Sequence, residues 1–255
     1  MSSRGFRNSG LTEETDQMIV SVSAPKAVVE EEPLEMKLLK ETKMVMRPLM
    51  GLLKKALKDQ KKKKKLQNNF PVQKVFILGI GNPEEKYNNT RHNIGKDWVE
   101  KIAKDHELSF VKKSKLKCSI CEVKPHVYLV APDVYVNESG KVASLLKRYL
   151  NAKPEYILVL HDDIDTQIGD AKFKSGGGDG GHNGLKDLSN VIGKDFKRLK
   201  IGVSHPGRKN EVTNWVLGKF KPAETQLLDE LYKKVMVHKD KIFNLEIGNL
   251  QNLVN

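Results

Sequence analysis

Between residues 74 and 243, short apolar runs alternate with segments whose apolar residues recur every three or four positions. The runs predict buried strands, and the helical spacing predicts amphipathic helices. We expect strands at 75–79, 117–123, 126–130, 156–160, 171–174 and 198–203. We expect helices at 92–107, 139–150, 183–192, 211–220 and 223–243. Strands that alternate with helices predict an α/β fold, a single three-layer domain with a mixed, mostly parallel sheet flanked by helices.

The first seventy residues follow a different pattern. They show no strand-like alternation, and charged blocks such as the acidic 30–32 and the basic 61–65 follow one another. Such a segment buries too little apolar area to offset the entropy of ordering. We therefore expect residues 1–70 to form a basic, largely disordered extension of a domain at 71–255. Within the extension, leucines at helical spacing beside lysines predict a basic amphipathic helix over 48–66, which suits a membrane surface, an RNA or a solvated linker.

Composition narrows the class of partner and the compartment. The chain carries 45 Lys and Arg against 32 Asp and Glu, a formal net charge of +13, which favours an acidic partner, nucleic acid first and an anionic membrane second. No apolar run reaches the roughly 18 residues of a transmembrane helix, and we expect no secretory signal. Two cysteines cannot form a disulfide framework. We therefore expect a reducing intracellular compartment, the cytoplasm or the mitochondrion, with the plastid as a third option.

Several local patterns resemble cofactor or metal sites but lack a necessary part. The Gly-x-Gly at 79–81 has no third glycine for a dinucleotide fold, and the glycine-rich segment 175–181 has no Gly-Lys-Ser/Thr after it. Cys118 and Cys121 have metal-ligand spacing, but on a strand they face opposite sides. The acidic segment 161–165 has no accompanying ligand set. We expect no metal and no cofactor.

Polar residues gather where three predicted strands end. They lie at 82–93, at 136–140, and at 161–165 together with 182–184. Sites in open α/β sheets lie beyond the carboxyl ends of the strands. A lone histidine or asparagine is more often structural, but several such sets at one edge of a sheet favour a functional site.

The same segments resemble bacterial-type peptidyl-tRNA hydrolases. The motifs are Gly-Asn-Pro-x3-Tyr-x2-Thr-Arg-His-Asn (81–93), Val-Asn-Glu-Ser-Gly (136–140), His-Asp-Asp-Ile-Asp (161–165), Lys-Phe-Lys-x-Gly-Gly-Gly-x-Gly-Gly-His-Asn-Gly (172–184) and Ile-Gly-x2-His-Pro-Gly (201–207). The resemblance covers residues 74 to about 243. It implies a phosphorylase/hydrolase-like fold, a monomer, and hydrolysis of the ester that joins a peptide to tRNA after stalled or aborted translation.

The resemblance also implies roles for individual residues. His92 would be the general base for a water molecule, and Asp162 would fix its tautomer. The substrate-binding residues would be Asn82, Tyr87, Asn137 and Asn183. Because an aminoacyl ester is already activated, a positioned base suffices, and neither a metal nor a covalent nucleophile is required.

Contact with the tRNA should be made mainly to phosphates, because such an enzyme accepts nearly all tRNAs. The basic candidates are Lys172, Lys174, Arg198 and Lys200, with Lys209 as a further one. Three positions depart from the family pattern. Lys200 stands where Arg is usual and lacks its bidentate geometry, Asp179 stands where His is usual, and Val136 where Met is usual.

Two alternatives remain open from the sequence. Plant chloroplast splicing factors resemble the same family, so the chain could be an RNA-binding protein without turnover. A hydrolase of a small ester or amide is the other alternative, and it would need no tRNA. The extension at 1–70 leaves the ribosome and an anionic membrane as partners, and it favours a eukaryotic or organellar version.

Overall fold

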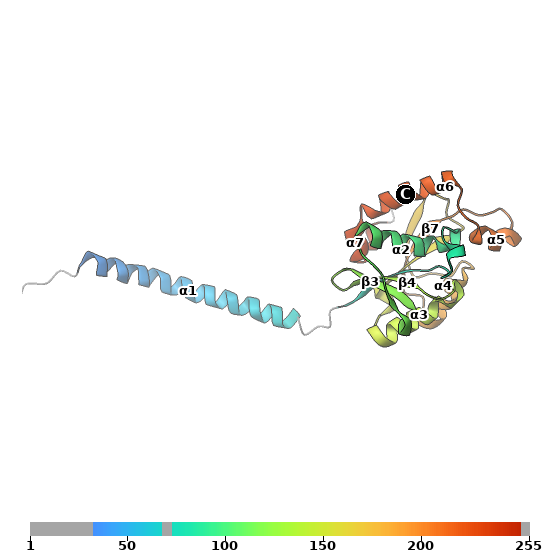
Figure 1. Ribbon diagram of the computed structural model, residues 1–255. Helices are drawn as coiled ribbons and strands as arrows, with labels where there is room; N and C mark the ends of the chain where they lie inside the picture. The colour runs from blue at the N-terminus through green and yellow to red at the C-terminus, as the bar shows by residue number, and fades with distance from the viewer. Residues whose placement is uncertain (1–32, 68–72, 251–255) are drawn as a thin grey trace, which may run out of the picture. The chain divides into compact units, whose positions relative to one another are not determined.

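The computed structural model describes residues 33–67 and 73–250 of the chain (Figure 1). The chain forms two compact units, Met1–Asn69 and Phe70–Asn255. No helix among the described residues is long and apolar enough to cross a membrane.

The described part of the first unit is one helix, α1 (Leu34–Gln67). It includes the range 48–66, where the sequence pattern predicts a helix, and it begins well before that range. The helix within the extension is thus confirmed, and it is longer than predicted. Leu, Met, Lys and Glu are strong helix formers, and they make up most of its sequence. The expectation for residues 1–32 lies outside the described residues.

The second unit is built on a seven-stranded sheet with the strand order β2-β3-β4-β1-β5-β7-β6. The strands are β1 (Val75–Gly79), β2 (Val111–Lys113), β3 (Cys118–Lys124), β4 (Val127–Pro132), β5 (Ile157–Asp163), β6 (Ala171–Ser175) and β7 (Lys197–Gly202). The four central strands β4, β1, β5 and β7 are parallel, and the three outer strands pair antiparallel to their neighbours. The predicted mixed sheet is therefore confirmed.

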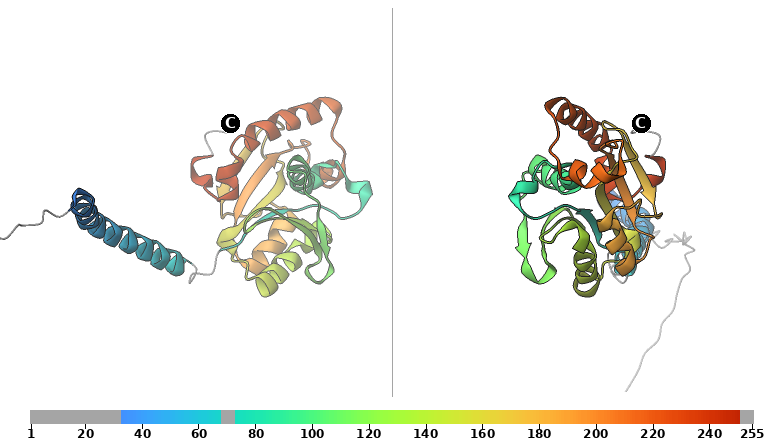
Figure 2. Two further views of the ribbon diagram at one scale, coloured as in Figure 1. Left: turned by 60° about the vertical axis from the view of Figure 1, so that its left-hand side comes forward. Right: turned by 90° about the vertical axis from the view of Figure 1, so that its right-hand side faces the viewer.

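Helices cover both faces of the sheet, which confirms the three layers (Figures 1 and 2). Apolar side chains of α2, α6 and α7 pack on one face, and those of α3 and α4 pack on the other. The helices are α2 (Ile94–Asp105), α3 (Ser139–Leu150), α4 (Asn183–Ile192), α5 (Val212–Leu217), α6 (Pro222–Met236) and α7 (Lys239–Phe243). α3 and α4 have the predicted bounds.

Three predicted helices differ from the structure in their bounds. The helix predicted at 211–220 is the shorter α5 (Val212–Leu217). The segment 92–107 begins as the 3-10 turn Arg91–Asn93, and α2 starts only after it. The segment 223–243 is interrupted between α6 and α7, so that Ile242 and Phe243 return to the core. The strand β2 was not predicted, because all three of its residues are exposed and two are lysines.

A pair of glycines lets α2 press against the sheet. A Cβ atom at Gly79 would lie 2.3 Å from the carbonyl oxygen of Gly95, and one at Gly95 would lie 2.1 Å from that of Leu160. Neither position can carry a side chain without movement of the backbone. The first glycine of the Gly-x-Gly at 79–81 therefore serves packing, and the close contact brings the start of α2 beside the end of β5.

The two cysteines lie on opposite sides of the sheet, as their spacing on β3 predicts. Cys118 belongs to the cluster under α3 and α4, and Cys121 belongs to the cluster under α2 and α6. Burial raises the pKa of Cys118 to about 12, with repulsion from Asp133 adding to it, and burial raises that of Cys121 to about 11. Both are free thiols, and they are structural.

Candidate active site

A cavity of about 590 Å³ lies at the carboxyl ends of β1 and β5. The polar sets that follow the strands contribute to its lining, together with the glycine-rich segment after β6 and one side of α5. The polar lining residues include Asn82, His92, Asn137, Asp162, His182 and Asn183. The structure thus brings five of the six sequence-predicted catalytic and substrate-binding residues to one cavity.

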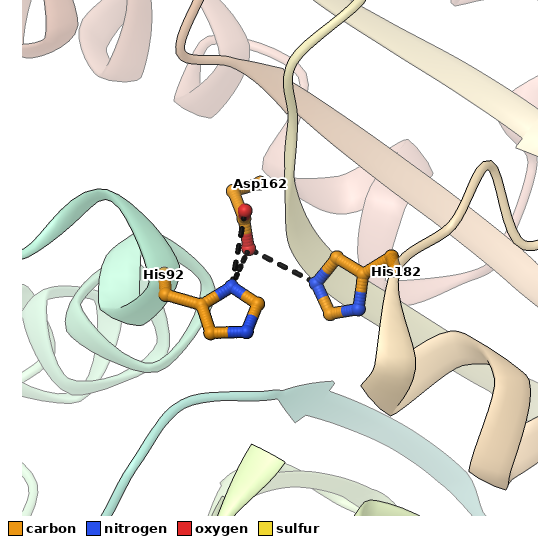
Figure 3. Close-up of side chains that lie close together, drawn as sticks. All are labelled: His92, Asp162 and His182. Atoms are coloured by element: carbon orange, nitrogen blue, oxygen red, sulfur yellow. Dashed lines mark hydrogen bonds and ion pairs between the residues drawn. The ribbon is translucent and has the colours of Figure 1, made fainter. Parts of the chain in front are cut away.

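His92 and Asp162 form the predicted pair (Figure 3). Nδ1 of His92 lies 2.9 Å from Oδ1 and 3.1 Å from Oδ2 of Asp162. A carboxylate only accepts, so this ring nitrogen carries the proton. In the neutral imidazole Nε2 is then the unprotonated nitrogen, and it makes no hydrogen bond to any residue that the structure describes.

Electrostatics favour an ionised Asp162 and a basic His92. Burial alone would raise the pKa of Asp162, which is 3% exposed, but attraction to His92 and His182 and their hydrogen bonds hold that pKa below its ordinary value. For His92, burial opposes the imidazolium, but the charge of Asp162 and its hydrogen bond outweigh burial and raise the pKa above 6.5.

His182 is a further residue of this cavity, and its sequence motif alone does not indicate a role for it. Its Nε2 lies 3.0 Å from Oδ1 of Asp162, and its Nδ1 accepts hydrogen bonds from the backbone N–H groups of Gly184 and Leu185. The imidazole is therefore the N-cap of α4 and donates through Nε2. Its place just before the predicted helix 183–192 was the signal for the cap, but the contact with Asp162 depends on the fold.

His161 lies beneath this group and is neutral. It is 1% exposed, its ring packs edge-on against that of His182, and its Nδ1 lies 2.7 Å from the backbone oxygen of Asp162. Burial lowers the pKa of His161 to about 3, and repulsion from His182 adds to the effect. His161 therefore adds no positive charge beside the carboxylate of Asp162.

His92, Asp162 and His182 each offer a ligand atom, and these atoms lie within 4.8 Å of one another. This spacing is compatible with a metal ion. However, both imidazoles meet the carboxylate through N–H donors at hydrogen-bond distance, and Nδ1 of His182 is already used as a helix cap. A metal would have to replace two protons in this arrangement, so the contacts fit a hydrogen-bonded group better than a ligand set.

The side-chain amide of Asn82 is oriented by its neighbours. Its Oδ1 accepts from the backbone N–H of Val136 at 3.1 Å, which leaves Nδ2 as the unused end. The side chain of Asn93 clamps the backbone of Asn82, accepting from its N–H and donating to its carbonyl at 2.9 and 3.0 Å. Asn82 thus presents an amide donor in the wall of the cavity.

The other predicted substrate residues occupy different environments. Asn137 and Asn183 are exposed, line the cavity and have side chains without a hydrogen bond to the described residues. Tyr87 does not line the cavity. Its ring lies edge-on against Tyr135, with 6.5 Å between centroids. Any effect of Tyr87 on the pocket must therefore act through its neighbours.

Four of the basic candidates lie on β6 and β7, and the fifth, Lys209, lies in the 3-10 turn Lys209–Glu211 and lines the cavity. Lys172 and Lys174 are exposed, and Lys174 and Lys200 line the cavity. Nζ of Lys200 lies 3.0 Å from Oδ2 of Asp163, so this lysine already has a partner. Position 200 usually holds an arginine in the family, which could make two parallel hydrogen bonds to a carboxylate or phosphate. Lys200 makes a single contact instead.

Arg198 differs from the exposed lysines because it is 2% exposed. Its two terminal nitrogens donate to the carbonyl oxygens of Gly177 and Gly178 at 2.9 and 2.6 Å. Gly177 has a φ of +106°, a conformation that favours glycine. In the described structure Arg198 therefore holds the glycine-rich segment, which differs from the expected direct contact with phosphate.

The two other departures from the family pattern also have structural partners. Oδ1 of Asp179 accepts from the backbone N–H of Gly181 at 3.0 Å within the glycine-rich segment. Val136 is buried in the core beneath α4, and it also lines the cavity.

Arg91 connects α5, which forms one wall of the cavity, to the 3-10 turn that carries His92. Its guanidinium stacks on Trp215 of α5 at 3.7 Å and makes two hydrogen bonds to Glu224 of α6, at 2.8 and 3.0 Å. It also donates to the carbonyl oxygens of Gly218 and Lys219. These contacts of Arg91 could not be predicted from its motif, because its partners lie more than 120 residues away.

Comparisons with known proteins agree with the motifs. The sequence model of the Peptidyl-tRNA hydrolase family matches residues 76–255. The peptidyl-tRNA hydrolase of Rickettsia canadensis (strain McKiel) is 40% identical over 183 residues, 71% of this chain and 99% of the relative. That of Rickettsia prowazekii (strain Madrid E) is 42% identical over 173 residues, 67% of this chain and 90% of the relative. The crystal structure of peptidyl-tRNA hydrolase from Acinetobacter baumannii matches with a TM-score of 0.67 and 33% identity, over 71% of this chain and 94% of that one.

Proposed function

The chain belongs to the peptidyl-tRNA hydrolase family, and we infer that it hydrolyses the ester bond between peptide and tRNA in peptidyl-tRNA from stalled or aborted translation. The observation that carries this inference is the His92–Asp162 pair at the end of β5, with Nε2 of His92 unused. A splicing factor or another RNA-binding scaffold would have no use for an oriented base, so turnover is favoured over that alternative.

We propose that His92 takes a proton from water through Nε2 while the water oxygen attacks the ester carbonyl. Asp162 stabilises the imidazolium that forms and keeps the proton on Nδ1. When the tetrahedral intermediate collapses, the C–O bond to the ribose breaks and His92 returns the proton to the 3′ oxygen. The products are a peptide with a free carboxyl group and tRNA with a free 3′ hydroxyl.

The asparagines supply hydrogen bonds in this scheme. Nδ2 of Asn82 donates to the peptide or the attacking water, since its Oδ1 is held by Val136. Asn137 and Asn183 line the cavity. In this scheme Asn183 contacts the substrate near the ester. Amide donors in such positions stabilise the developing oxyanion.

The tRNA backbone contacts the face of β6 and β7. The exposed Lys172 and Lys174 support this proposal, and Lys200 can exchange Asp163 for a phosphate oxygen. Arg198 contributes by holding the carbonyls of Gly177 and Gly178. Phosphate contacts of this kind carry no sequence information, as a substrate class that includes nearly all tRNAs requires.

We further propose a monomer, as the resemblance to the family implies. The free thiols support a reducing compartment, the cytoplasm or the mitochondrion, with the plastid as a third option. The basic extension would contact a ribosome or an anionic membrane.

The experiment measures release of peptide from N-acetyl-aminoacyl-tRNA by the purified chain, with and without EDTA. We expect turnover that survives EDTA and is lost with His92→Ala. Tight binding of tRNA or intron RNA by a chain without turnover would support the scaffold alternative. Hydrolysis of small esters without any need for tRNA would support the other hydrolase.

A further inference from the structure

The helix α1 (Leu34–Gln67) exposes a set of large apolar side chains with no place in either core cluster, since those clusters contain residues from 75 onward. Each of these side chains is 49–79% exposed: Leu34, Met36, Leu38, Leu39, Met44, Val45, Met46, Leu49, Met50, Leu52, Leu53 and Leu57. An exposed apolar set of this extent marks an interaction surface.

These apolar side chains are gathered on one side of the helix. At about 100° per residue, ten of the twelve fall within an arc of about 160°, and only Met36 and Met44 lie outside it. We call this the apolar arc. Glu35 is the one acidic residue in it.

The basic residues of the helix occupy the opposite side. From Lys37 to Lys61, every lysine and the single arginine fall within an arc of about 120° that does not overlap the apolar arc. Over the whole helix there are 12 basic and 3 acidic residues, a net charge of +9. The partner of this face must therefore be strongly anionic.

We propose that α1 lies in the plane of an anionic lipid surface, with its apolar arc among the acyl chains and its lysines directed to the headgroups. This inference rests on the proposed contact of the extension with an anionic surface, and it selects the membrane. An RNA would neutralise the lysines but leave ten apolar side chains in water. A lipid surface satisfies both arcs at once, because long lysine side chains extend along the apolar boundary to the charged headgroups.

The helix lies on this surface and does not cross it. Its lysine arc runs from the first turns to Lys61, so any spanning orientation would place several charges in the hydrocarbon. The same arrangement makes binding depend on lipid charge and on salt.

The test uses flotation of the full chain with two kinds of vesicle, phosphatidylcholine alone and phosphatidylcholine with about 30% phosphatidylglycerol. We expect binding to the anionic vesicles only, and its loss in high salt. The double variant Leu49→Ser/Leu53→Ser should bind at least about tenfold more weakly, because it removes two members of the apolar arc. The matched control Met36→Ser/Met44→Ser removes two exposed apolar side chains outside the arc and should bind within about threefold of the unchanged chain.

Equal binding to neutral and anionic vesicles, or no binding to either, would overturn the proposal. Tight binding of ribosomal RNA that is weakened by Lys54→Glu/Lys55→Glu and unaffected by Leu49→Ser/Leu53→Ser would assign the helix to RNA instead. Peptide release in vesicle-free buffer separates the two hypotheses. The helix variants should keep full turnover there, and His92→Ala should lose turnover while it still binds anionic vesicles.

Discussion

His92 and His182 approach the same carboxylate with different ring nitrogens. Nδ1 of His92 lies 2.9 Å and Nε2 of His182 lies 3.0 Å from Oδ1 of Asp162. The second nitrogen of His182 is used to cap α4, whereas Nε2 of His92 has no partner among the residues that the structure describes. The hydrogen bonds therefore assign the two histidines different tautomers and leave one of them to act as the base.

Replacement of His92 by alanine should lower the rate of peptide release at least about a hundredfold, since the attacking water loses its proton acceptor. Binding of tRNA should persist, because the basic residues on β6 and β7 are untouched. The two quantities are measured by single-turnover hydrolysis and by equilibrium binding of deacylated tRNA. Retained turnover would remove His92 from the mechanism.

The pH dependence of kcat/KM should report the titration of His92. The neutral imidazole is the active form, so activity should fall as the pH drops through its pKa, which Asp162 raises above 6.5. In Asp162→Asn this pKa should fall, because the attraction that stabilises the imidazolium is lost. The acidic limb of the profile should therefore move to lower pH while the plateau drops by about a hundredfold or more. An unmoved limb would mean that another group titrates.

The two contacts of His182 can be separated with a pair of variants. His182→Ala removes both the helix cap and the donor to Asp162, and it should cost about 1 kcal/mol of stability and about tenfold in kcat. His182→Asn restores a good N-cap residue on a shorter side chain, so it should recover the stability and not the rate. Thermal unfolding and single-turnover kinetics check these outcomes. If His182→Asn recovers both the stability and the rate, His182 acts only as the N-cap of α4.

Charge removal at the edge of the sheet should change the salt dependence of tRNA binding. Lys174→Ala/Lys200→Ala should weaken binding and flatten the plot of log K against log salt by up to about two units. Lys174 should account for most of the effect, since Lys200 must first leave Asp163. The matched control is Lys234→Ala/Lys239→Ala, two exposed lysines on α6 and α7, which should leave the slope unchanged. Equal slopes for both double variants would place the RNA elsewhere.

Substitution of Arg91 should loosen the wall formed by α5. Arg91→Lys keeps the charge but loses the paired hydrogen bonds to Glu224 and the stacking on Trp215. Arg91→Ala would leave Glu224 without its partner and should cost about 3 kcal/mol of unfolding free energy, the lower end of the range for a partly buried pair. For Arg91→Lys we expect a raised KM with kcat within about threefold, because the substrate wall moves and the base does not. A fall in kcat alone would contradict this role.

Much of the fold could be predicted because its signals are local. The bounds of α3 and α4 follow from helical spacing, and β1 follows from an apolar run that is buried on both faces. The strand β2 could not be found in this way, since it is held by backbone pairing with β3 and not by burial of its side chains.

The sequence motifs predicted which residues lie at the site, but not which contacts these residues make. The motifs brought Asn82, His92 and Asp162 to one edge of the sheet, and the structure has them there. The loop contact of Arg198 depends on how a glycine-rich segment folds back, which no periodicity encodes. The same holds for the contacts of Arg91. The roles of Asn137 and Asn183 in substrate binding stay predictions.

The close contact between Gly79, Gly95 and Leu160 limits the distance between His92 and Asp162. Gly95 lies three positions after His92, and Leu160 lies two positions before Asp162. A methyl group at residue 95 would push α2 away from β5 and so move His92 away from Asp162. Gly79 and Gly95 are not among the residues that line the cavity, yet their missing side chains allow His92 and Asp162 to lie within hydrogen-bond distance.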